Sequence, residues 1–465
     1  MKLSVNKFKA IIIFLFFSFS ILYFSYFPGA YSFDSVFLLL DSLGYANYNV
    51  ATSPLSSIFL KIFFNYSFGS FLSLYILIIL SFFLLFRNKL YFSGIFFGLI
   101  LCTPAVLQTV VFAWKDNFLA ILMLISILFY EKQNNIGVNK FIVLAILFLA
   151  FTMRVNSVFA ITPILFLVFN CLCWYKKILM VLITLTCFSF FNHTVNTYLF
   201  DAKTTSMETS IPLTDIAKMN YYSRSSIENH IPDIFLIKDN LESNNVKKMF
   251  SYYNDFCCND ILYMYKNWHD ANAFLTLSKA SEIDNSKLKY NWFKYILSNP
   301  KLYLEIRYIQ WSNSLFSLNV PIPKYSLNPS NDIQKITSSG GMIRVFNYND
   351  ISNKIYQPLN INIAKIIIDK YELMLKNDII RDISYPVGYL LLEIILLMVL
   401  IIKNDHRFYL VKSVMLSGIF YSIGYFPIMP CTDYRYFLWT VISCFFSFGL
   451  FLDYNNQNLK GSHDE

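Results

Sequence analysis

The chain contains a series of apolar stretches that approach or reach the length needed to cross a lipid bilayer, with short polar loops between most of them. A helix needs about 20 consecutive apolar residues to cross a hydrocarbon core about 30 Å thick. Of the 465 residues, 56% are hydrophobic and only 14% are charged. The apolar residues are gathered in runs and are not spread with the period of an amphipathic helix, so the sequence predicts an all-α polytopic membrane protein.

About ten membrane-spanning helices are expected. The first apolar run follows Lys2, Lys7 and Lys9, as in a signal peptide, but it lacks a convincing small-residue cleavage site, so we expect an uncleaved first helix. The predicted spans are Ala10–Phe27, Gly69–Phe86, Phe92–Phe112, Asn117–Tyr130, Val138–Met153, Ser157–Tyr175, Ile178–Phe200, Ile383–Ile402, Phe408–Pro427 and Tyr436–Leu452.

Short basic clusters predict the orientation of these spans. Cytoplasmic loops are enriched in Lys and Arg, so both termini are predicted to be cytoplasmic. The formal charge of +9 comes mainly from such clusters, and the sequence has no zinc-ligand spacing or RNA-binding motif, so nucleic acid is not expected as a partner. The predicted cytoplasmic loops contain Arg87 and Lys89, Lys132 and Lys140, Lys176 and Lys177, and Lys403 and Arg407.

This topology divides the chain into three parts. Residues 1–200 hold the first seven spans and a first outer segment, 28–67, in which the short apolar stretches Val36–Leu43 and Pro54–Phe64 are expected to lie on the membrane surface. Residues 201–382 are expected to form a small α-rich outer domain. Residues 383–465 hold the last three spans and a short cytoplasmic tail.

Asp34 is the first candidate catalytic residue. It follows the Pro28-Gly29 turn and precedes Ser35, so its carboxylate is expected at the outer interface. A partly desolvated carboxylate can act as a general base on an acceptor hydroxyl. The alternative is a helix N-cap for the stretch that begins at Val36.

Further charged residues are predicted on the same side of the membrane, at the ends of other spans. Lysine and arginine there suit a phosphate group, while each could instead be an interfacial anchor or a snorkelling end residue. The candidates for donor-phosphate binding are Lys115, Arg154 and Arg435; Asp116 is a second candidate carboxylate, and Asn156, Asp433 and Tyr436 are supporting residues.

Other residues are weaker candidates for a catalytic or binding role. Glu393 lies inside the predicted span Ile383–Ile402, where we expect a buried, hydrogen-bonding carboxyl group. The sequence has no phosphate-binding glycine loop, serine–histidine triad or metal-binding histidine pair, which argues against nucleotide hydrolysis. A disulfide between Cys431 and either Cys257 or Cys258 is left open.

The order of these features resembles polytopic GT-C-type glycosyltransferases, including the serotype-converting glucosyltransferases that modify bacterial O-antigen. The matching pieces are Pro28-Gly29 with Asp34-Ser35, Pro54, Lys115-Asp116, Arg154 with Asn156, and Asp433-Tyr434-Arg435-Tyr436. The stretches Pro212-Leu213-Thr214-Asp215-Ile216-Ala217 and Trp292-Phe293-Lys294-Tyr295-Ile296-Leu297-Ser298-Asn299-Pro300 are also similar to members of this group.

The resemblance implies transfer of a sugar, such as glucose, from an undecaprenyl-phosphate donor to a polysaccharide or lipid-linked oligosaccharide on the outer face of a bacterial inner membrane. By position, Asp34 would be the base, and Lys115, Arg154 and Arg435 would hold the departing phosphate. Asp116 would be a second acid or a metal partner. No cofactor is required by the resemblance, and dependence on a divalent metal is left open.

Two other functions remain open. An O-antigen polymerase is also polytopic, but arginine-rich outer loops would favour it, and the outer segment here holds only Arg224, Arg307, Arg344 and Arg381. A lipid-linked saccharide transporter or flippase would be expected to show related halves and polar residues at mid-membrane, of which only Glu393 is present. The features at the outer interface favour the transferase.

The substitution Asp34→Asn distinguishes a role of Asp34 as general base from a role as helix N-cap. Asparagine keeps the capping ability and the size of aspartate but cannot accept the proton. If Asp34 is the base, sugar transfer by the purified protein, supplied with a polyprenyl-phosphate sugar, should fall by roughly a hundredfold or more while the protein stays inserted and stable. Near-normal transfer would mean that Asp34 is only a cap and would direct the search to Asp116.

Overall fold

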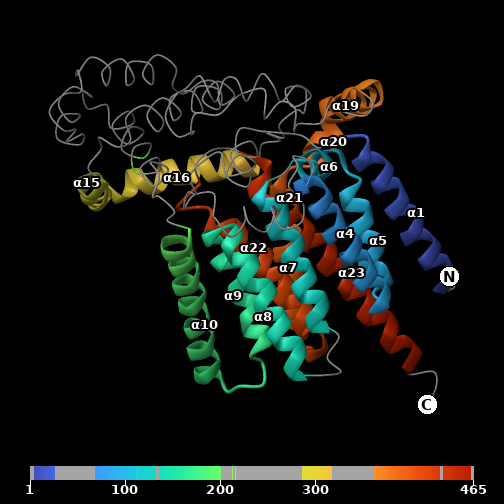
Figure 1. Ribbon diagram of the computed structural model, residues 1–465, viewed down its shortest axis with the longest axis horizontal. Helices are drawn as coiled ribbons and strands as arrows, with labels where there is room; N and C mark the ends of the chain where they lie inside the picture. The colour runs from blue at the N-terminus through green and yellow to red at the C-terminus, as the bar shows by residue number, and fades with distance from the viewer. Residues whose placement is uncertain are drawn as a thin grey trace.

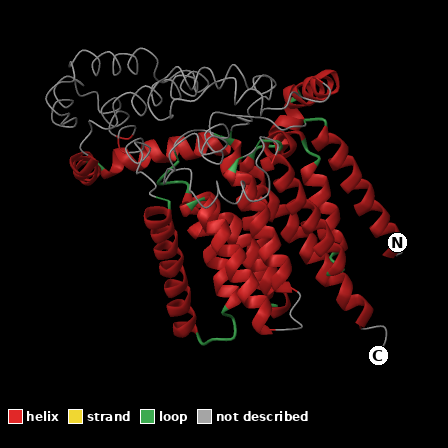
Figure 2. Ribbon diagram, in the orientation of Figure 1, coloured by secondary structure: helices red, strands yellow, loops and turns green. Residues whose placement is uncertain are grey.

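The computed structural model describes residues 5–26, 69–112, 114–131, 136–200, 212, 215, 285–316, 361–429 and 433–461. Within these ranges all regular structure is helical, which confirms the predicted all-α class (Figure 2). The first outer segment, with Asp34, Ser35 and both predicted surface helices, lies outside the described residues, as do Cys257, Cys258 and Cys431.

Helices occur at every predicted span (Figure 1). The bundle contains α1 (Val5–Phe24), α4 (Gly69–Arg87), α5 (Tyr91–Leu101), α6 (Pro104–Val110), α7 (Lys115–Glu131), α8 (Ile136–Met153), α9 (Val158–Val168), α10 (Trp174–Thr194, continued by the π-helix Val195–Leu199), α21 (Pro386–Lys403), α22 (Tyr409–Gly424) and α23 (Leu438–Gly461). Short 3-10 helices cover Val155–Ser157, His406–Phe408 and Tyr434–Phe437, the last called η6 here. Outside the bundle lie α15 (Asn285–Ser298), α16 (Pro300–Leu315), α19 (Ile361–Lys376) and α20 (Asp378–Ile383).

Four helices in the described ranges are long and apolar enough to cross a membrane: Val5–Phe24, Trp174–Leu199, Pro386–Lys403 and Tyr434–Asn456. The predicted single span Phe92–Phe112 is a bent pair instead, because α5 and α6 meet at 80°. Pro104 begins α6 and cannot donate the hydrogen bond that would continue α5. The protein therefore has the character of a membrane protein, and the total of about ten spans stays a prediction.

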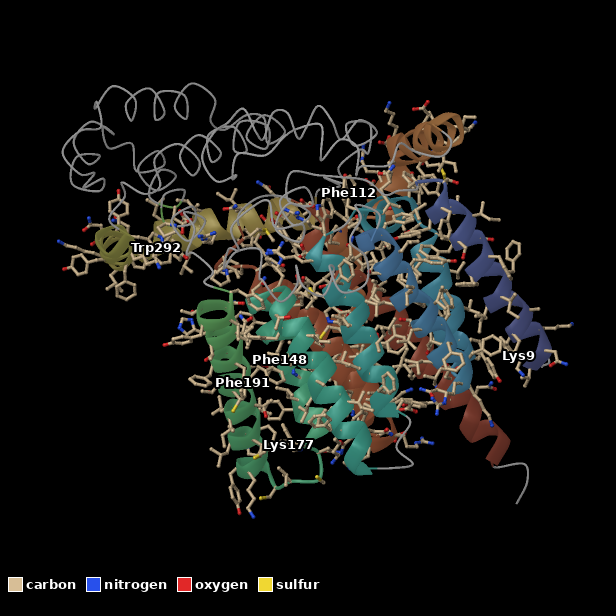
Figure 3. The ribbon with its side chains drawn as sticks, viewed as in Figure 1. Lys9, Phe112, Phe148, Lys177, Phe191 and Trp292 are labelled. Atoms are coloured by element: carbon tan, nitrogen blue, oxygen red, sulfur yellow. The ribbon has the colours of Figure 1, made fainter. Side chains whose placement is uncertain are left out.

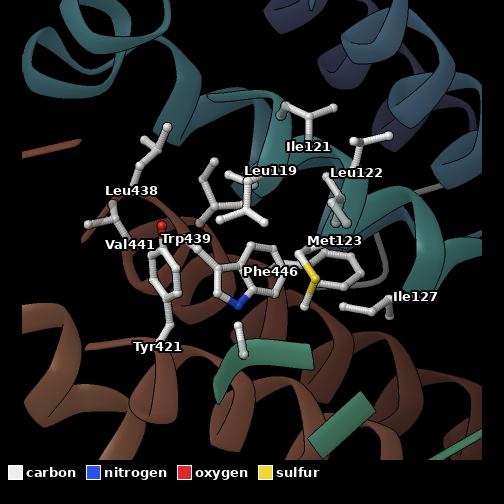
Figure 4. Close-up of a cluster of buried hydrophobic side chains, with 14 of the residues drawn as sticks. Leu119, Ile121, Leu122, Met123, Ile127, Tyr421, Leu438, Trp439, Val441 and Phe446 are labelled. Atoms are coloured by element: carbon white, nitrogen blue, oxygen red, sulfur yellow. The ribbon is translucent and has the colours of Figure 1, made fainter. Parts of the chain in front are cut away.

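Helix α7 lies at the centre of the bundle, and its side chains are buried from Asp116 to Leu128. Figure 4 shows Met123 of α7 beside Phe446 and Trp439 of α23. The Trp439 Nε1–H donates to Ser417 Oγ at 2.9 Å, and Ser417 Oγ donates to the Ala160 carbonyl at 2.6 Å, so α23, α22 and α9 are joined inside the core. The large exposed side chains of the outer helices, such as Phe141 and Ile402, are suited to contact with lipid.

The buried carboxyl group of Glu393 joins three helices, in agreement with the interpretation of this residue as a buried hydrogen-bonding group. The Ser443 hydroxyl of α23 donates to Glu393 Oε1 at 2.6 Å. Gly418 of α22 lies so close that a β-carbon there would come within 2.6 Å of Glu393 Oε2 and still closer to Ser443 Oγ. Glycine is therefore needed where α21, α22 and α23 cross.

The two ends of the bundle differ in their residues. One end, which we call the basic end, holds Arg87 at the end of α4, Lys177 at the start of α10 and Lys403 at the end of α21. The start of α1 and the end of α23 also lie there, whereas α16, α19 and α20 lie at the opposite end, which we call the α16 end (Figure 1). Figure 3 shows the same separation, with Lys9 and Lys177 far from Phe112 and Trp292.

This arrangement predicts that reporter fusions at Asn404 and after Gly461 will report a cytoplasmic location, since the basic end should face the cytoplasm. Asn404 is a suitable site because it is exposed and follows α21. A fusion within Ser251–Ser281 should report the outer side. A cytoplasmic signal from that fusion would contradict the orientation and place every candidate site residue on the wrong face.

Candidate functional site

The turn between α6 and α7 positions Lys115 and Asp116, two of the candidate residues. The rings of Phe112 and Trp114 stack with centroids 4.4 Å apart. The Asn117 side-chain amide donates to the carbonyls of Thr109 and Phe112 at 2.8 and 2.7 Å, which satisfies acceptors at the end of α6. The turn is therefore fixed, and it places Asp116 in the first turn of α7 at the α16 end.

Asp116 and Arg154 form a two-point ion pair. Arg154 Nε lies 2.7 Å from Asp116 Oδ1, and Arg154 Nη2 donates to Asp116 Oδ2 at 2.7 Å. The Asp116 side chain is 1% exposed and the Arg154 side chain 17%. The planar guanidinium matches the carboxylate in this geometry, and the pair joins the start of α7 to the end of α8.

Tyr425, which directly follows α22, contacts the same carboxylate. The Tyr425 hydroxyl donates to Asp116 Oδ1 at 3.4 Å and lies 3.2 Å from the hydroxyl of Tyr421, one turn earlier. The Asn156 side chain is hydrogen-bonded to the same Tyr425 hydroxyl. Asn156 therefore reaches this carboxylate through Tyr425, and its supporting role stays a prediction.

The second arginine, Arg435, lies in η6 at the entrance to α23. Its Nε is 3.0 Å from Asp433 Oδ2, and Asp433 Oδ1 accepts from the Arg435 backbone N–H at 3.1 Å, so Asp433 both caps η6 and pairs with the guanidinium. The guanidinium carbon lies 4.7 Å from the centre of the Trp114 ring and 5.1 Å from that of Tyr436. Arg435 thus lies against aromatic side chains from two parts of the chain.

Tyr436 connects the two arginines. The guanidinium carbon of Arg154 lies 5.2 Å from the centre of the Tyr436 ring, and Arg435 Nη2 donates to the Tyr436 hydroxyl at 3.2 Å. We call Asp116, Arg154, Asp433, Arg435 and Tyr436 the ion-pair cluster. The two carboxylates balance the two guanidinium charges in a region where unpaired charges would be costly.

The ion-pair cluster brings together residues that the sequence singled out separately. Six of the predicted site residues meet at the α16 end: Asp116, Arg154, Asn156, Asp433, Arg435 and Tyr436. Lys115 begins α7, next to Asp116. Asp34 and Ser35 lie outside the described residues. Among the residues that the structure describes, no group of three or more His, Cys, Asp or Glu side chains is arranged to hold a metal ion.

Sequence reasoning missed three polar residues near this site. Tyr421 and Tyr425 were read only as part of an apolar span, although their spacing of four places them on one face of α22. Gln108 of α6 is fully buried, and neither polar atom of its side-chain amide has a hydrogen-bond partner among the residues that the structure describes. An isolated glutamine within the apolar run Phe92–Phe112 was the available signal.

A third buried ion pair links α16 to Asp215, and a hydrogen bond from Trp292 to the same carboxylate joins the two stretches of residues 201–382 that also carry the resemblance. Arg307 Nη2 of α16 donates to Asp215 Oδ2, and Trp292 Nε1 of α15 donates to the same oxygen at 3.0 Å. The Arg307 and Asp215 side chains are 2% and 1% exposed. On the same helix, burial raises the pKa of Tyr303, and the nearby Arg307 charge opposes this rise.

No family model matches the chain, and neither the curated proteins nor the solved structures include a match to it.

The Asp116–Arg154 pair predicts a clear effect on stability. Asp116→Asn would leave the Arg154 charge without its carboxylate at a mostly buried position, which should lower the free energy of unfolding by about 3 kcal/mol. Thermal unfolding in nanodiscs would measure the change. The matched control is Glu305→Gln, which removes the exposed Lys301–Glu305 pair of α16 and should change the free energy by less than about 0.5 kcal/mol. Equal effects of the two substitutions would contradict this account.

Proposed function

We propose that the chain is a membrane glycosyltransferase that moves a sugar from a polyprenyl-phosphate donor to a surface-polysaccharide or lipid-linked acceptor. The observation that carries the proposal is the ion-pair cluster, in which Arg154 and Arg435 both lie close to one tyrosine ring at a single end of a helical bundle. Two guanidinium groups so placed suit the phosphate of a lipid-linked donor, because each offers planar donors to phosphate oxygens.

The two carboxylates of the cluster are suited to orienting the two arginine side chains. Asp116 fixes Arg154 through two contacts, and Asp433 fixes Arg435 through its side chain and its backbone N–H. Arginines held in this way need little rearrangement when negative charge develops on a leaving phosphate, which is how electrostatic catalysis works best. Lys115 would add a further positive charge from the first residue of α7.

The proposed reaction has one bond-making and one bond-breaking event. An acceptor hydroxyl oxygen attacks the anomeric carbon, the bond from that carbon to the phosphate oxygen breaks, and polyprenyl phosphate leaves with the bonding electron pair. Asp34 is the proposed base that takes the hydroxyl proton. Asp116 stays a second candidate carboxylate, although its two contacts with Arg154 favour an orienting role.

The rival functions would leave different products. Deleting the gene and measuring the mass of the surface-polysaccharide repeat unit should reveal the loss of one hexose from each unit. Shorter polymers with unchanged repeat units would instead indicate a polymerase. An unchanged polysaccharide would contradict both enzymatic functions.

Arg435→Lys tests the phosphate role directly. Lysine keeps the charge but loses the planar pair of donors and the stacking on Trp114 and Tyr436, so the KM for a polyprenyl-phosphate sugar should rise by about tenfold. Protein abundance and thermal stability must be measured alongside. Transfer equal to that of the parent at low donor concentration would mean that Arg435 is only an anchor at the end of a span.

A further inference from the structure

Helix α16 holds the segment that connects α22 to the ion-pair cluster. This segment, Tyr425–Met429, is called the α22 exit segment here. Its inner turn is closed by the backbone N–H groups of Ile428 and Met429, which both donate to the Tyr425 carbonyl, at 3.1 and 2.8 Å. Figure 1 shows α16 lying across this end of the bundle, roughly perpendicular to its helices.

Four side chains of α16 donate to carbonyl groups in or next to this segment. Two of them, Arg307 Nη1 at 3.1 Å and Gln310 Nε2 at 2.8 Å, share the Met429 carbonyl. The Trp311 Nε1–H donates to the Ser422 carbonyl at 2.9 Å, and the Tyr303 hydroxyl donates to the Pro427 carbonyl at 3.4 Å. The contacts therefore reach from the last turn of α22 to the end of the segment.

Arg307 is the residue on which this attachment depends most. Its other terminal nitrogen donates to Asp215, so one guanidinium joins a carboxylate of the outer segment to a carbonyl of the bundle. Both partners of the ion pair are almost fully buried. A buried arginine with a fixed carboxylate has one favourable orientation, which fixes where Met429 can lie.

The α22 exit segment in turn contacts the ion-pair cluster at its first residue, where the ring centres of Tyr425 and Tyr436 lie 4.9 Å apart, and it is close to the cluster in sequence at its last residue. Tyr425 begins the segment and donates to Asp116 Oδ1. Met429 ends it, and only residues 430–432 separate Met429 from Asp433, the partner of Arg435. A displacement of the segment would therefore affect the surroundings of both arginines.

We propose that Arg307 is a positioning residue through which the outer segment sets the geometry of the ion-pair cluster. The sequence resemblance and the proposed chemistry assign no such role to it. Its effect on catalysis rests on the proposed function, whereas the mechanical coupling between α16 and the cluster can be measured without any reaction.

Hydrogen exchange of the full-length protein in nanodiscs tests the coupling. Arg307→Lys keeps a positive charge for Asp215 but cannot serve both partners with one planar group. Gln310→Met removes a donor to the Met429 carbonyl without changing either partner of the Arg307–Asp215 pair, and it is the second variant if Arg307→Lys fails to fold. In both, amide exchange should rise at least tenfold in residues 425–429 and also in η6. Lys301→Ala, in the exposed pair of the same helix, should change neither.

Kinetics with polyprenyl-phosphate glucose provide the second measurement. The positioning variants should lower kcat/KM by about tenfold or more, while Lys301→Ala should match the parent. Unchanged exchange in η6 would overturn the proposal, whether or not the protein transfers sugar. Faster exchange with unchanged kcat/KM in an active enzyme would also overturn it. If the parent transfers no sugar, the proposed function fails, and the exchange data alone decide whether Arg307 couples the two regions.

Discussion

The Asp116–Arg154 ion pair is the interaction on which the α16 end of the bundle depends. Charges near hydrocarbon are tolerated only when they are paired or solvated, and Asp116 begins a helix whose side chains are buried for most of its length. The carboxylate is therefore committed to Arg154, and the Tyr425 hydroxyl completes its surroundings. The Tyr436 ring lies close to both Arg154 and Arg435, so the second ion pair forms beside the first.

Buried carboxyl groups are also held by polar partners elsewhere in the bundle. At the basic end, the Asp453 carboxylate of α23 accepts from the backbone N–H groups of Phe92 and Ser93, each at 2.9 Å, and so caps the start of α5. In the interior, Glu393 accepts from Ser443 beside Gly418. Helices in lipid gain little from burying apolar surface against one another, so such polar contacts and close glycine crossings specify which helices are neighbours.

The sequence predicted the helices because the length of an apolar run is a local property. It also singled out Asp116, Arg154 and Arg435, which interrupt apolar runs and which the structure brings together at the α16 end. It did not predict their pairing. Asp116 was expected as a second candidate carboxylate, and only the packing of α7 against α8 reveals that it pairs with Arg154. The bend at Pro104 was also missed, because the apolar run continues through it.

The burial of α7 on every side bears on how the chain is made in the cell. Asp116 and Arg154 lie close in sequence, so their pair can form soon after both helices leave the ribosome. Tyr425, Arg435 and Trp439 are synthesised near the end of the chain, yet they cover the same region of α7. During most of synthesis this helix must therefore be sheltered by lipid or by the insertion machinery, and a nascent chain lacking its last two helices would expose side chains of α7 that are buried in the complete protein.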